Sequence, residues 1–331
     1  MESGTCQSGT CQSGTVELES YENKLFSQNG EDGITVKLIE LLYANDHSNK
    51  YYVEFGVENG AECNTRILRE IYNWPGLQMD GSNENTALNL RREFITKENV
   101  VELFKKYNVP PLINLLSVDI DFNDFYCLNE ILQHFTCDII ICEYNATHLS
   151  LEDKIVIYDK NGCWDGSNYF GASLYALEQL GRKYNYTLVY CNKNGVNCFF
   201  VRTALLQEKQ LDFKNVGDIT KIYRKAHYGY GPNGGHRIDP YDRKYITFAE
   251  ALTDMYTSID IGPSETNEKE IILPNSYMDG SLFVLNKHNY RDTFDIKFNG
   301  QSLKFKRTDV IENIGWCYPH KGFIMSSQSL V

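Results

Sequence analysis

Four apolar runs that each end on an acidic residue constrain the fold of this chain more than any other feature. They end on Glu54, Asp80, Asp119 and Glu143. Runs of Val, Ile and Leu without polar alternation are typical of parallel strands that helices cover on both faces. The carboxyl ends of parallel strands meet at one edge of the sheet, where ligands bind in folds of this kind. The pattern therefore predicts an α/β fold with carboxylates gathered at one sheet edge.

The chain after the fourth run completes the predicted sheet with a hairpin. Tyr186–Tyr190 and Asn197–Arg202 are strand-like and flank Asn194–Gly195, a pair typical of a hairpin turn. With a short strand expected around Phe94–Ile95, this gives a Rossmann-like seven-stranded, mostly parallel sheet with a terminal antiparallel hairpin. Helices are expected between the strands, and one over Ile34–Tyr43 precedes the first of them.

The sequence divides into three parts. Residues 1–20 carry a tandem Ser-Gly-Thr-Cys-Gln repeat without apolar spacing, so we expect a disordered, low-complexity tail. Residues 21–203 form the predicted core. Residues 204–331 are a C-terminal extension, which we expect to serve substrate binding or oligomerisation. Helical patterns over 204–226 and 245–258, and strand-like runs from about Glu270, predict a small C-terminal α/β appendage.

The composition excludes several classes of partner. The chain carries 44 acidic against 32 basic residues and a formal net charge of −12, without a run rich in Lys or Arg, which argues against binding to nucleic acid. No apolar run approaches the roughly 18 residues of a membrane span. The ten cysteines are scattered, and Cys142 and Cys198 lie in apolar runs, so we expect reduced thiols and a cytoplasmic protein.

The segment Glu54–Gly60 has the pattern Glu-x-Gly-x-x-x-Gly, followed by a predicted helix over Ala61–Tyr72. Gly56 would let the backbone approach a ligand closely, and Gly60 would let the helix pack on the strand. An acid at this strand end disfavours the pyrophosphate of a dinucleotide and favours an ammonium group. In nucleotide-binding sheets, an acid at the end of the second strand, here Asp80, accepts hydrogen bonds from the ribose hydroxyls. The two features together predict a nucleoside site.

Five segments together resemble the FkbM-like branch of class I S-adenosylmethionine-dependent methyltransferases. They are Ser27–Gly33, Glu54–Gly60, Asp80, Ser117–Asp124 and Glu143–Asn145, and the resemblance covers roughly residues 25–202. Its most specific parts are Ser-Val-Asp-Ile-Asp-x-Asn-Asp and Glu-Tyr-Asn, with Phe122 at a position where glycine is expected. The resemblance implies O-methyl transfer to a small polar acceptor, a sugar or glycoconjugate.

The resemblance also implies the residues of the cofactor site. Glu54 and the Gly56–Gly60 turn would hold the methionine moiety, Asp80 the ribose, and the Ser117–Asp119 strand end would border the adenosyl group or the reacting centre. The full predicted set is Gln28, Asp32, Glu54, Gly56, Val57, Gly60, Asn64, Asp80, Gly81, Ser117 and Asp119.

Methyl transfer to a hydroxyl requires a base or a metal ion that takes up or weakens the hydroxyl proton. Asp121, Glu143 and His148 are the predicted catalytic residues, with His148 as a base because it follows Glu143 closely. Asp119, Asp121, Glu143 and Asn145 supply the oxygen ligands that Mg²⁺ or another divalent cation prefers. In the alternative interpretation, Asp119 and Asp121 cap the next helix and contact the cofactor, while Glu143 forms a salt bridge.

Two other functions fit the same fold. A non-catalytic module would keep the nucleotide pocket and bind a partner protein, but clustered carboxylates without a task repel one another. An NAD-dependent dehydrogenase is less consistent with the sequence because Gly-x-Gly-x-x-Gly is missing and Glu54 stands at the strand end. In the C-terminal extension, the Gly-rich aromatic segment Tyr228–His236 is predicted to cover the acceptor, with His227 and His236 at the mouth of the site.

Overall fold

The computed structural model describes residues 14–44, 46–232 and 234–253, and beyond them seven strands between Tyr256 and Ser326. The tandem repeat lies in residues 1–13, outside the described residues. Residues that follow it belong to the fold, because Val16 forms a β-bridge with Phe213 and Leu18 in the short helix η1 (Leu18–Tyr21) is buried. The described fold therefore includes residues that were predicted to belong to the tail.

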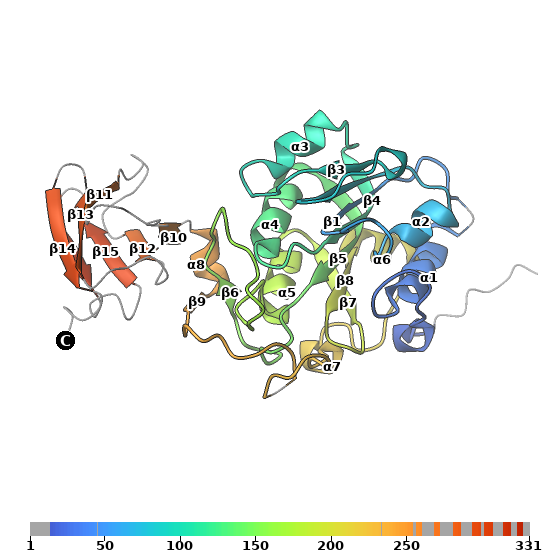
Figure 1. Ribbon diagram of the computed structural model, residues 1–331. Helices are drawn as coiled ribbons and strands as arrows, with labels where there is room; N and C mark the ends of the chain where they lie inside the picture. The colour runs from blue at the N-terminus through green and yellow to red at the C-terminus, as the bar shows by residue number, and fades with distance from the viewer. Residues whose placement is uncertain are drawn as a thin grey trace, which may run out of the picture.

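The centre of the molecule is a seven-stranded sheet in the order β3-β2-β1-β4-β5-β8-β7 (Figure 1). Neighbouring strands from β3 to β5 are parallel, whereas β8 is antiparallel to both β5 and β7. The predicted fold class, a mostly parallel Rossmann-like sheet with a terminal antiparallel hairpin, is therefore confirmed. The strands are β1 (Tyr52–Phe55), β2 (Gly76–Asp80), β3 (Leu90–Arg92), β4 (Leu112–Val118), β5 (Thr136–Glu143), β7 (Tyr186–Cys191) and β8 (Asn197–Arg202).

Helices cover both faces of this sheet, which explains the continuous apolar runs. In β1, Val53 and Phe55 face one hydrophobic core, and Tyr52 faces the other. The first core includes side chains of α3 (Val100–Lys106), α4 (Asp124–His134) and α5 (Leu174–Lys183). The second includes side chains of α1 (Glu31–Tyr43), α2 (Arg66–Glu70) and α6 (Thr203–Lys209).

Two elements of the sheet region differ from the prediction. The third strand covers Leu90–Arg92 and not Phe94–Ile95, because Leu90 pairs with Gln78 and the chain leaves the sheet after Arg92. The helix expected over Ala61–Tyr72 is reduced to the five residues of α2. The turn that replaces its first part belongs to the candidate site.

The first part of the C-terminal extension packs on the core. Instead of one helix over 204–226, α6 ends at Lys209 and a short helix, α7 (Ile219–Ile222), follows a loop in which Asn215 and Gly217 have positive φ. The predicted 245–258 helix is also wrong. That stretch forms β9 (Tyr245–Ile246), which pairs with β6 (Ile155–Val156), then α8 (Phe248–Leu252) and β10 (Tyr256–Ile259).

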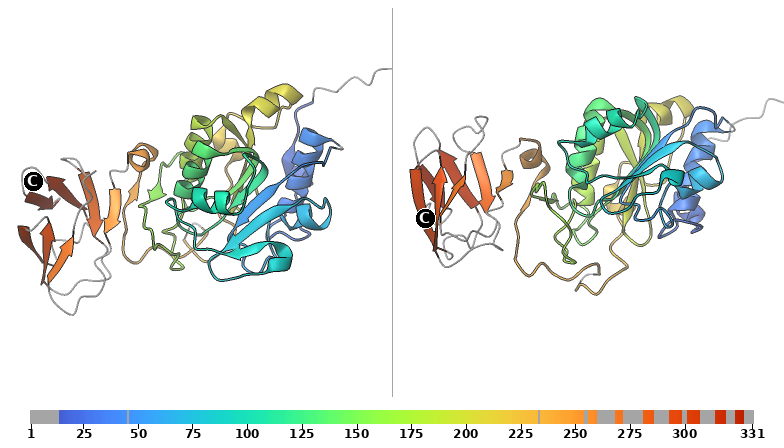
Figure 2. Two further views of the ribbon diagram at one scale, coloured as in Figure 1. Left: turned by 90° about the horizontal axis from the view of Figure 1, so that it is seen from above. Right: turned by 45° about the horizontal axis from the view of Figure 1, so that its top comes forward.

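The remaining described residues form two small sheets. Figure 2 shows their strands grouped beyond α8, apart from the seven-stranded sheet. One sheet has the order β10-β12-β15-β16 and the other β11-β13-β14. The sequence also predicts a turn at Asn299 and Gly300, which lie outside the described residues. The strands are β11 (Glu268–Ile271), β12 (Ser281–Leu285), β13 (Thr293–Phe298), β14 (Gln301–Lys306), β15 (Ile314–Tyr318) and β16 (Phe323–Ser326).

Among the described residues, none of the helices combines the length and the apolar character needed to cross a bilayer.

Candidate functional site

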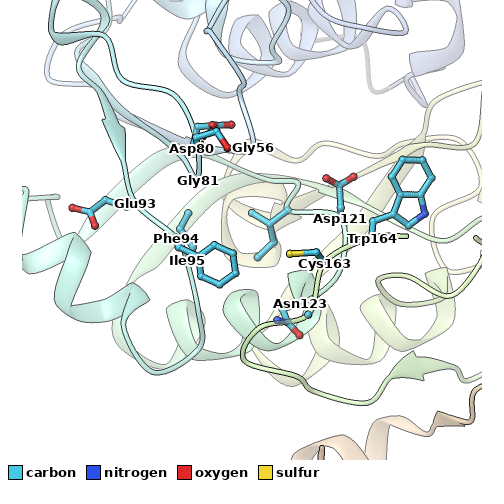
Figure 3. A pocket seen from close by; sticks show the side chains of 13 residues that line it. Gly56, Asp80, Gly81, Glu93, Phe94, Ile95, Asp121, Asn123, Cys163 and Trp164 are labelled. Carbon is cyan, nitrogen blue, oxygen red and sulfur yellow. Dashed lines mark hydrogen bonds between the residues drawn. The ribbon is translucent and has the colours of Figure 1, made fainter. Parts of the chain in front are cut away.

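A pocket of about 280 Å³ opens at the carboxyl edge of the sheet, between the ends of β1, β2 and β4 (Figure 3). Asp80 lines it on one side, and Asp121 and Trp164 lie together on the other. This volume is just below the roughly 300 to 1,000 Å³ of typical small-molecule pockets, so the pocket suits a small ligand such as a nucleoside. The lining residues are Gly56, Asp80, Gly81, Ser82, Glu93, Phe94, Ile95, Ile120, Asp121, Asn123, Gly162, Cys163 and Trp164.

At Gly56, the backbone that follows β1 packs closely against the backbone at the end of β4. Its φ is +66°, and a Cβ atom at this position would lie 1.7 Å from the carbonyl oxygen of Asp119. Only glycine allows this backbone approach. The sequence predicted a close approach to a ligand; Gly56 does line the pocket, but its tightest contact is with the protein backbone itself.

Asp80 fixes the turn after β1 to the loop after β2. Its Oδ2 atom accepts a hydrogen bond from the Glu58 N–H (2.9 Å), and its Oδ1 atom accepts from the N–H groups of Ser82 and Asn83 (both 2.8 Å) and from Asn83 Nδ2 (2.9 Å). A carboxylate oxygen offers two lone pairs, so Oδ2 of this pocket-lining residue keeps one acceptor position that the described residues do not use. This geometry suits one ribose hydroxyl, where the sequence predicted contacts with both.

Glu54 is 3% exposed and uses both of its oxygens within the protein. Oε1 accepts from the Asn64 N–H (2.7 Å), and Oε2 accepts from the N–H (3.0 Å) and hydroxyl (2.5 Å) of Thr65. The carboxylate thereby holds the turn that leads into α2, which is why the helix begins later than predicted. Glu54 is not among the residues that line the pocket, so the predicted contact with the methionine moiety has no direct counterpart in this geometry.

The Ser27–Gly33 lead-in is held by Asp32. Its Oδ2 atom accepts from the N–H groups of Leu25 (2.9 Å), Phe26 (2.8 Å) and Ser27 (2.7 Å), whereas the Gln28 side chain is exposed. Of the remaining predicted cofactor residues, Gly81 is the one that lines the pocket. Val57 is buried against Cys63 and Leu90, Gly60 has a positive φ of +77°, and Asn64 Nδ2 donates to Ser117 Oγ (3.1 Å).

Three carboxylates meet beside the pocket. Asp119, Asp121 and Glu143, the carboxylate triad, each have an oxygen within 4.8 Å of the others. The parallel register of β4 and β5, in which Val118 lies opposite Cys142, brings the first and third members side by side. Asp121 has a left-handed φ of +64° and also lines the pocket, so it links the triad to the pocket.

The triad is a region of uncompensated negative charge. Loss of hydration raises the pKa of all three carboxyl groups, and the charged groups with the largest effect on them are other acids. For Asp119 and Glu143, the pKa rises well above its ordinary range, and the nearby Asp124 contributes to both. No hydrogen bond from a described protein group reaches any of the three carboxylates. Such a site binds a proton or a cationic group.

Asp124 is a fourth acid that the sequence analysis did not select. It is 1% exposed at the beginning of α4, and its Oδ1 atom accepts from the Ile120 N–H (2.7 Å). Its Oδ2 atom has no hydrogen-bond partner among the described residues, and burial raises its pKa to about 7. The signal for it was present in the Ser-Val-Asp-Ile-Asp-x-Asn-Asp motif, whose last residue it is.

Asn145 does not join the triad, which corrects its prediction as a metal ligand. Its Nδ2 atom donates to the carbonyl oxygens of Asn168 (2.8 Å) and Phe170 (2.9 Å), and its Oδ1 atom accepts from the N–H (3.2 Å) and hydroxyl (2.5 Å) of Thr147. The side chain therefore holds the connection before α5, and all of its polar atoms are used.

His148 is also placed away from the triad. It is 5% exposed, and its ring meets the Tyr245 ring edge-on at 4.6 Å between centroids. Burial lowers its pKa to about 4, and the charged groups that act on it are Lys154 and Glu152, not the triad. The prediction that His148 is the base next to Glu143 therefore lacks the required geometry.

An aromatic cluster around His236 was not predicted as a unit. The His236 ring lies 4.4 Å from Trp164, 5.2 Å from Tyr228 and 5.5 Å from Phe170, measured between centroids. Trp164 also lines the pocket. The aromatic cluster therefore extends from the pocket into the segment Tyr228–His236. The sequence contained its parts in two separate segments, without a signal that they meet.

The chain matches no model of a known protein family, and no curated protein is similar to it.

Proposed function

We propose that this protein is an S-adenosylmethionine-dependent O-methyltransferase whose acceptor is a small polar molecule, a sugar or glycoconjugate. One observation carries the proposal: a pocket with an aspartate at the end of β2 adjoins three carboxylates without a compensating cation. S-adenosylmethionine combines a ribose with a sulfonium and an ammonium group, and so matches both halves. The strand topology supports the proposal as well, since the resemblance implied a terminal antiparallel hairpin.

Each part of the site has a separate role in the proposed reaction. Asp80 receives a ribose hydroxyl through the open position on Oδ2, and Gly56 and Gly81 leave room for the nucleoside. S-adenosylmethionine, when bound, supplies a methyl group on positively charged sulfur. The carboxylate triad stabilises that charge and accepts the proton that the acceptor hydroxyl releases. Aligning the reactants is the main contribution of the protein, because it removes most of the entropic barrier.

A divalent cation is the alternative occupant of the triad. The three carboxylates offer oxygen ligands of the kind that Mg²⁺ and Mn²⁺ prefer, and their spacing allows a common ion. A bound ion would lower the pKa of an acceptor hydroxyl. Exhaustive dialysis against EDTA, followed by addition of Mg²⁺ or Mn²⁺, decides between the two forms of the proposal. Loss and recovery of methyl transfer supports the cation, and undiminished transfer supports direct carboxylate catalysis.

Ligand binding tests the proposal itself. S-adenosylhomocysteine should raise the melting temperature in proportion to the logarithm of its concentration, because a ligand that binds only the folded state stabilises it. NAD at the same concentrations should leave the melting temperature unchanged. Stabilisation by NAD alone would instead favour a dehydrogenase, and no response to either ligand would contradict a nucleoside site.

We further propose a cytoplasmic location. The seven cysteines between residues 14 and 253 are free thiols, and all except Cys163 are buried. Thiols persist in this form in a reducing compartment.

A further inference from the structure

The asparagine at the beginning of β8 lies beside the carboxylate triad. β5 and β8 are antiparallel, and Asn197 is paired with Glu143 in their register. The Tyr144 N–H donates to the Val196 carbonyl oxygen (2.9 Å), which makes these two residues a hydrogen-bonded pair. The adjacent pair of Glu143 and Asn197 is therefore non-hydrogen-bonded, the kind in which side chains are closest. Side chains of such a pair extend from the same face of the sheet, with Cβ atoms about 4.5 to 5.5 Å apart.

The Asn197 side chain is 3% exposed, and one of its two polar atoms is unused. Its Nδ2 atom donates to Glu31 Oε1 (3.0 Å), whereas its Oδ1 atom has no hydrogen-bond partner among the described residues. The contact with a carboxylate fixes the orientation of the amide, because only the NH₂ group donates. The atom that remains for a ligand next to Glu143 is therefore a carbonyl oxygen.

This oxygen belongs to a larger group of acceptors without donors. Glu143 Oε2 is also buried without a partner in the described part of the chain. Asp119 and Asp121 each have an oxygen within 4.8 Å of one on Glu143. The ends of β4 and β5, the loop after β4 and the beginning of β8 thus present four neighbouring side chains with oxygen ligands. Buried acceptors are almost always satisfied, so this group requires a partner.

The charge of the group selects the partner. Water molecules donate to such oxygens but leave the charge of three carboxylates unbalanced. An ammonium group balances one carboxylate, and a divalent cation balances two. Burial of charge is costly without such compensation. Carboxylate and amide oxygens are also the ligands that hard divalent cations prefer.

We propose, as a refinement of the proposed methyltransferase function, that the triad holds a Mg²⁺ or Mn²⁺ ion and that Asn197 is its fourth protein ligand. The sequence analysis expected the amide ligand at Asn145, all of whose polar atoms are used elsewhere. The amide ligand comes instead from β8, a strand that contributes no other predicted site residue. An octahedral ion with these four ligands keeps positions for water or for the acceptor hydroxyl.

Glu31 is the positioning residue of this ligand. Besides Asn197, it accepts hydrogen bonds from Asn192 Nδ2 (2.8 Å) on Oε1 and from the Asn29 N–H (2.8 Å) on Oε2. The carboxylate is therefore fixed from three sides and holds the Asn197 amide in one orientation. Partners of this kind set the direction of a metal ligand and increase its basicity.

Mn²⁺ binding to the full chain tests the assignment of Asn197, with Asn145→Ala as the matched control for Asn197→Ala. After removal of bound metal with EDTA and dialysis, the electron paramagnetic resonance signal of free Mn²⁺ gives the affinity of each protein. We expect Asn197→Ala to weaken binding roughly tenfold or more, the scale on which supporting residues already act. Asn145→Ala should lower the melting temperature and leave the Mn²⁺ affinity within about twofold of the wild type.

Crystals of the wild type grown with Mn²⁺ provide a measurement that does not depend on the folding of a variant. The anomalous difference map should show an ion within about 2.6 Å of oxygens of the triad and of Asn197 Oδ1. Failure of the wild type to bind Mn²⁺, an ion that does not contact Asn197, or equal affinities of wild type and Asn197→Ala would each overturn the assignment.

S-adenosylhomocysteine binding is recorded separately and keeps the two proposals apart. An ion on Asn197 in a wild type that does not bind S-adenosylhomocysteine would contradict the methyltransferase proposal and leave the ion site intact. Binding of S-adenosylhomocysteine without Mn²⁺ binding would contradict the ion site alone.

Discussion

The two halves of the carboxyl edge use the same sequence pattern in opposite ways. At the ends of β1 and β2, Glu54 and Asp80 accept seven hydrogen bonds from the protein between them. At the ends of β4 and β5, the triad accepts none from the described residues. An acid that is saturated with donors holds the fold, whereas an acid without donors keeps its capacity for a ligand. The difference shows that an acid at the end of a strand predicts a carboxylate at this edge of the sheet. It does not predict whether that carboxylate stabilises the fold or binds a ligand.

The largest expected contrast comes from removing a charge in the triad. Glu143→Gln preserves shape and breaks no hydrogen bond from a described residue, so the free energy of unfolding should stay the same or rise as like-charge repulsion falls. Methyl transfer to a sugar acceptor should fall by about 100-fold or more, since the acceptor hydroxyl loses its base. Single-turnover transfer of a labelled methyl group and urea denaturation measure the two effects. Retained activity together with lower stability would place Glu143 with the structural acids.

A Glu→Gln substitution at the end of β1 should change stability instead. Glu54→Gln presents an NH₂ group to the donors of Asn64 and Thr65 and should lower the free energy of unfolding by about 3 kcal/mol, the scale of hydrogen bonds to a buried charged group. Urea denaturation under the conditions used for Glu143→Gln gives the comparison directly. Equal stability of the two variants would show that Glu54 and Glu143 do not differ in their contribution to the fold.

Asp80 lies between the two extremes, because it holds the fold and also faces the pocket. Asp80→Ala should weaken S-adenosylhomocysteine binding by about 2 kcal/mol, as expected for one hydrogen bond to a charged acceptor. Titration calorimetry measures this, with Asp218→Ala, an acid outside the pocket lining, as the control. Unchanged affinity in Asp80→Ala would show that the nucleoside binds elsewhere.

The smallest expected effect concerns His148, which, like Glu54, should affect stability and not methyl transfer. Its pKa in the folded protein is lowered to about 4 from an ordinary value of 6.5, mainly by burial. As the pH falls below 6.5, the unfolded chain takes up the proton first, so stability is lost toward pH 4. His148→Gln should remove about 1 to 2 kcal/mol of this loss between pH 7 and pH 5 and leave methyl transfer intact. A large drop in transfer would return His148 to the catalytic residues.

The sequence was sufficient to predict the sheet and the edge at which the carboxylates gather, because both follow from apolar periodicity and from the polarity of strand ends. It was not sufficient to assign tasks to the acids. The donors that saturate Glu54 are backbone N–H groups of Asn64 and Thr65, and these face the carboxylate only because the turn replaces a helix. Asn145 looked like a metal ligand until its amide was seen to hold Asn168 and Phe170.

The acceptor side of the site was even less predictable from the sequence. Trp164 and His236 are far apart in the sequence, and neither belongs to a periodic segment from which their contact could be derived. The Asn197 amide oxygen, which has no partner among the described residues, is likewise a property of the folded molecule. Sequence patterns predict where backbone elements run, but not which polar atoms remain unbonded.

Asp121 is one wall of the pocket and one member of the triad, and its left-handed backbone leaves it little freedom to adjust to each separately. A ligand in the pocket and a ligand at the triad therefore meet the Asp121 carboxylate in the same position. Equilibrium linkage then requires that nucleoside and acceptor change each other's affinity by one common factor. If the sulfonium-bearing form neutralises Asp121 better than the spent nucleoside does, this factor differs between substrate and product. The site would then hold its acceptor while the methyl group is available and release the product once transfer is complete.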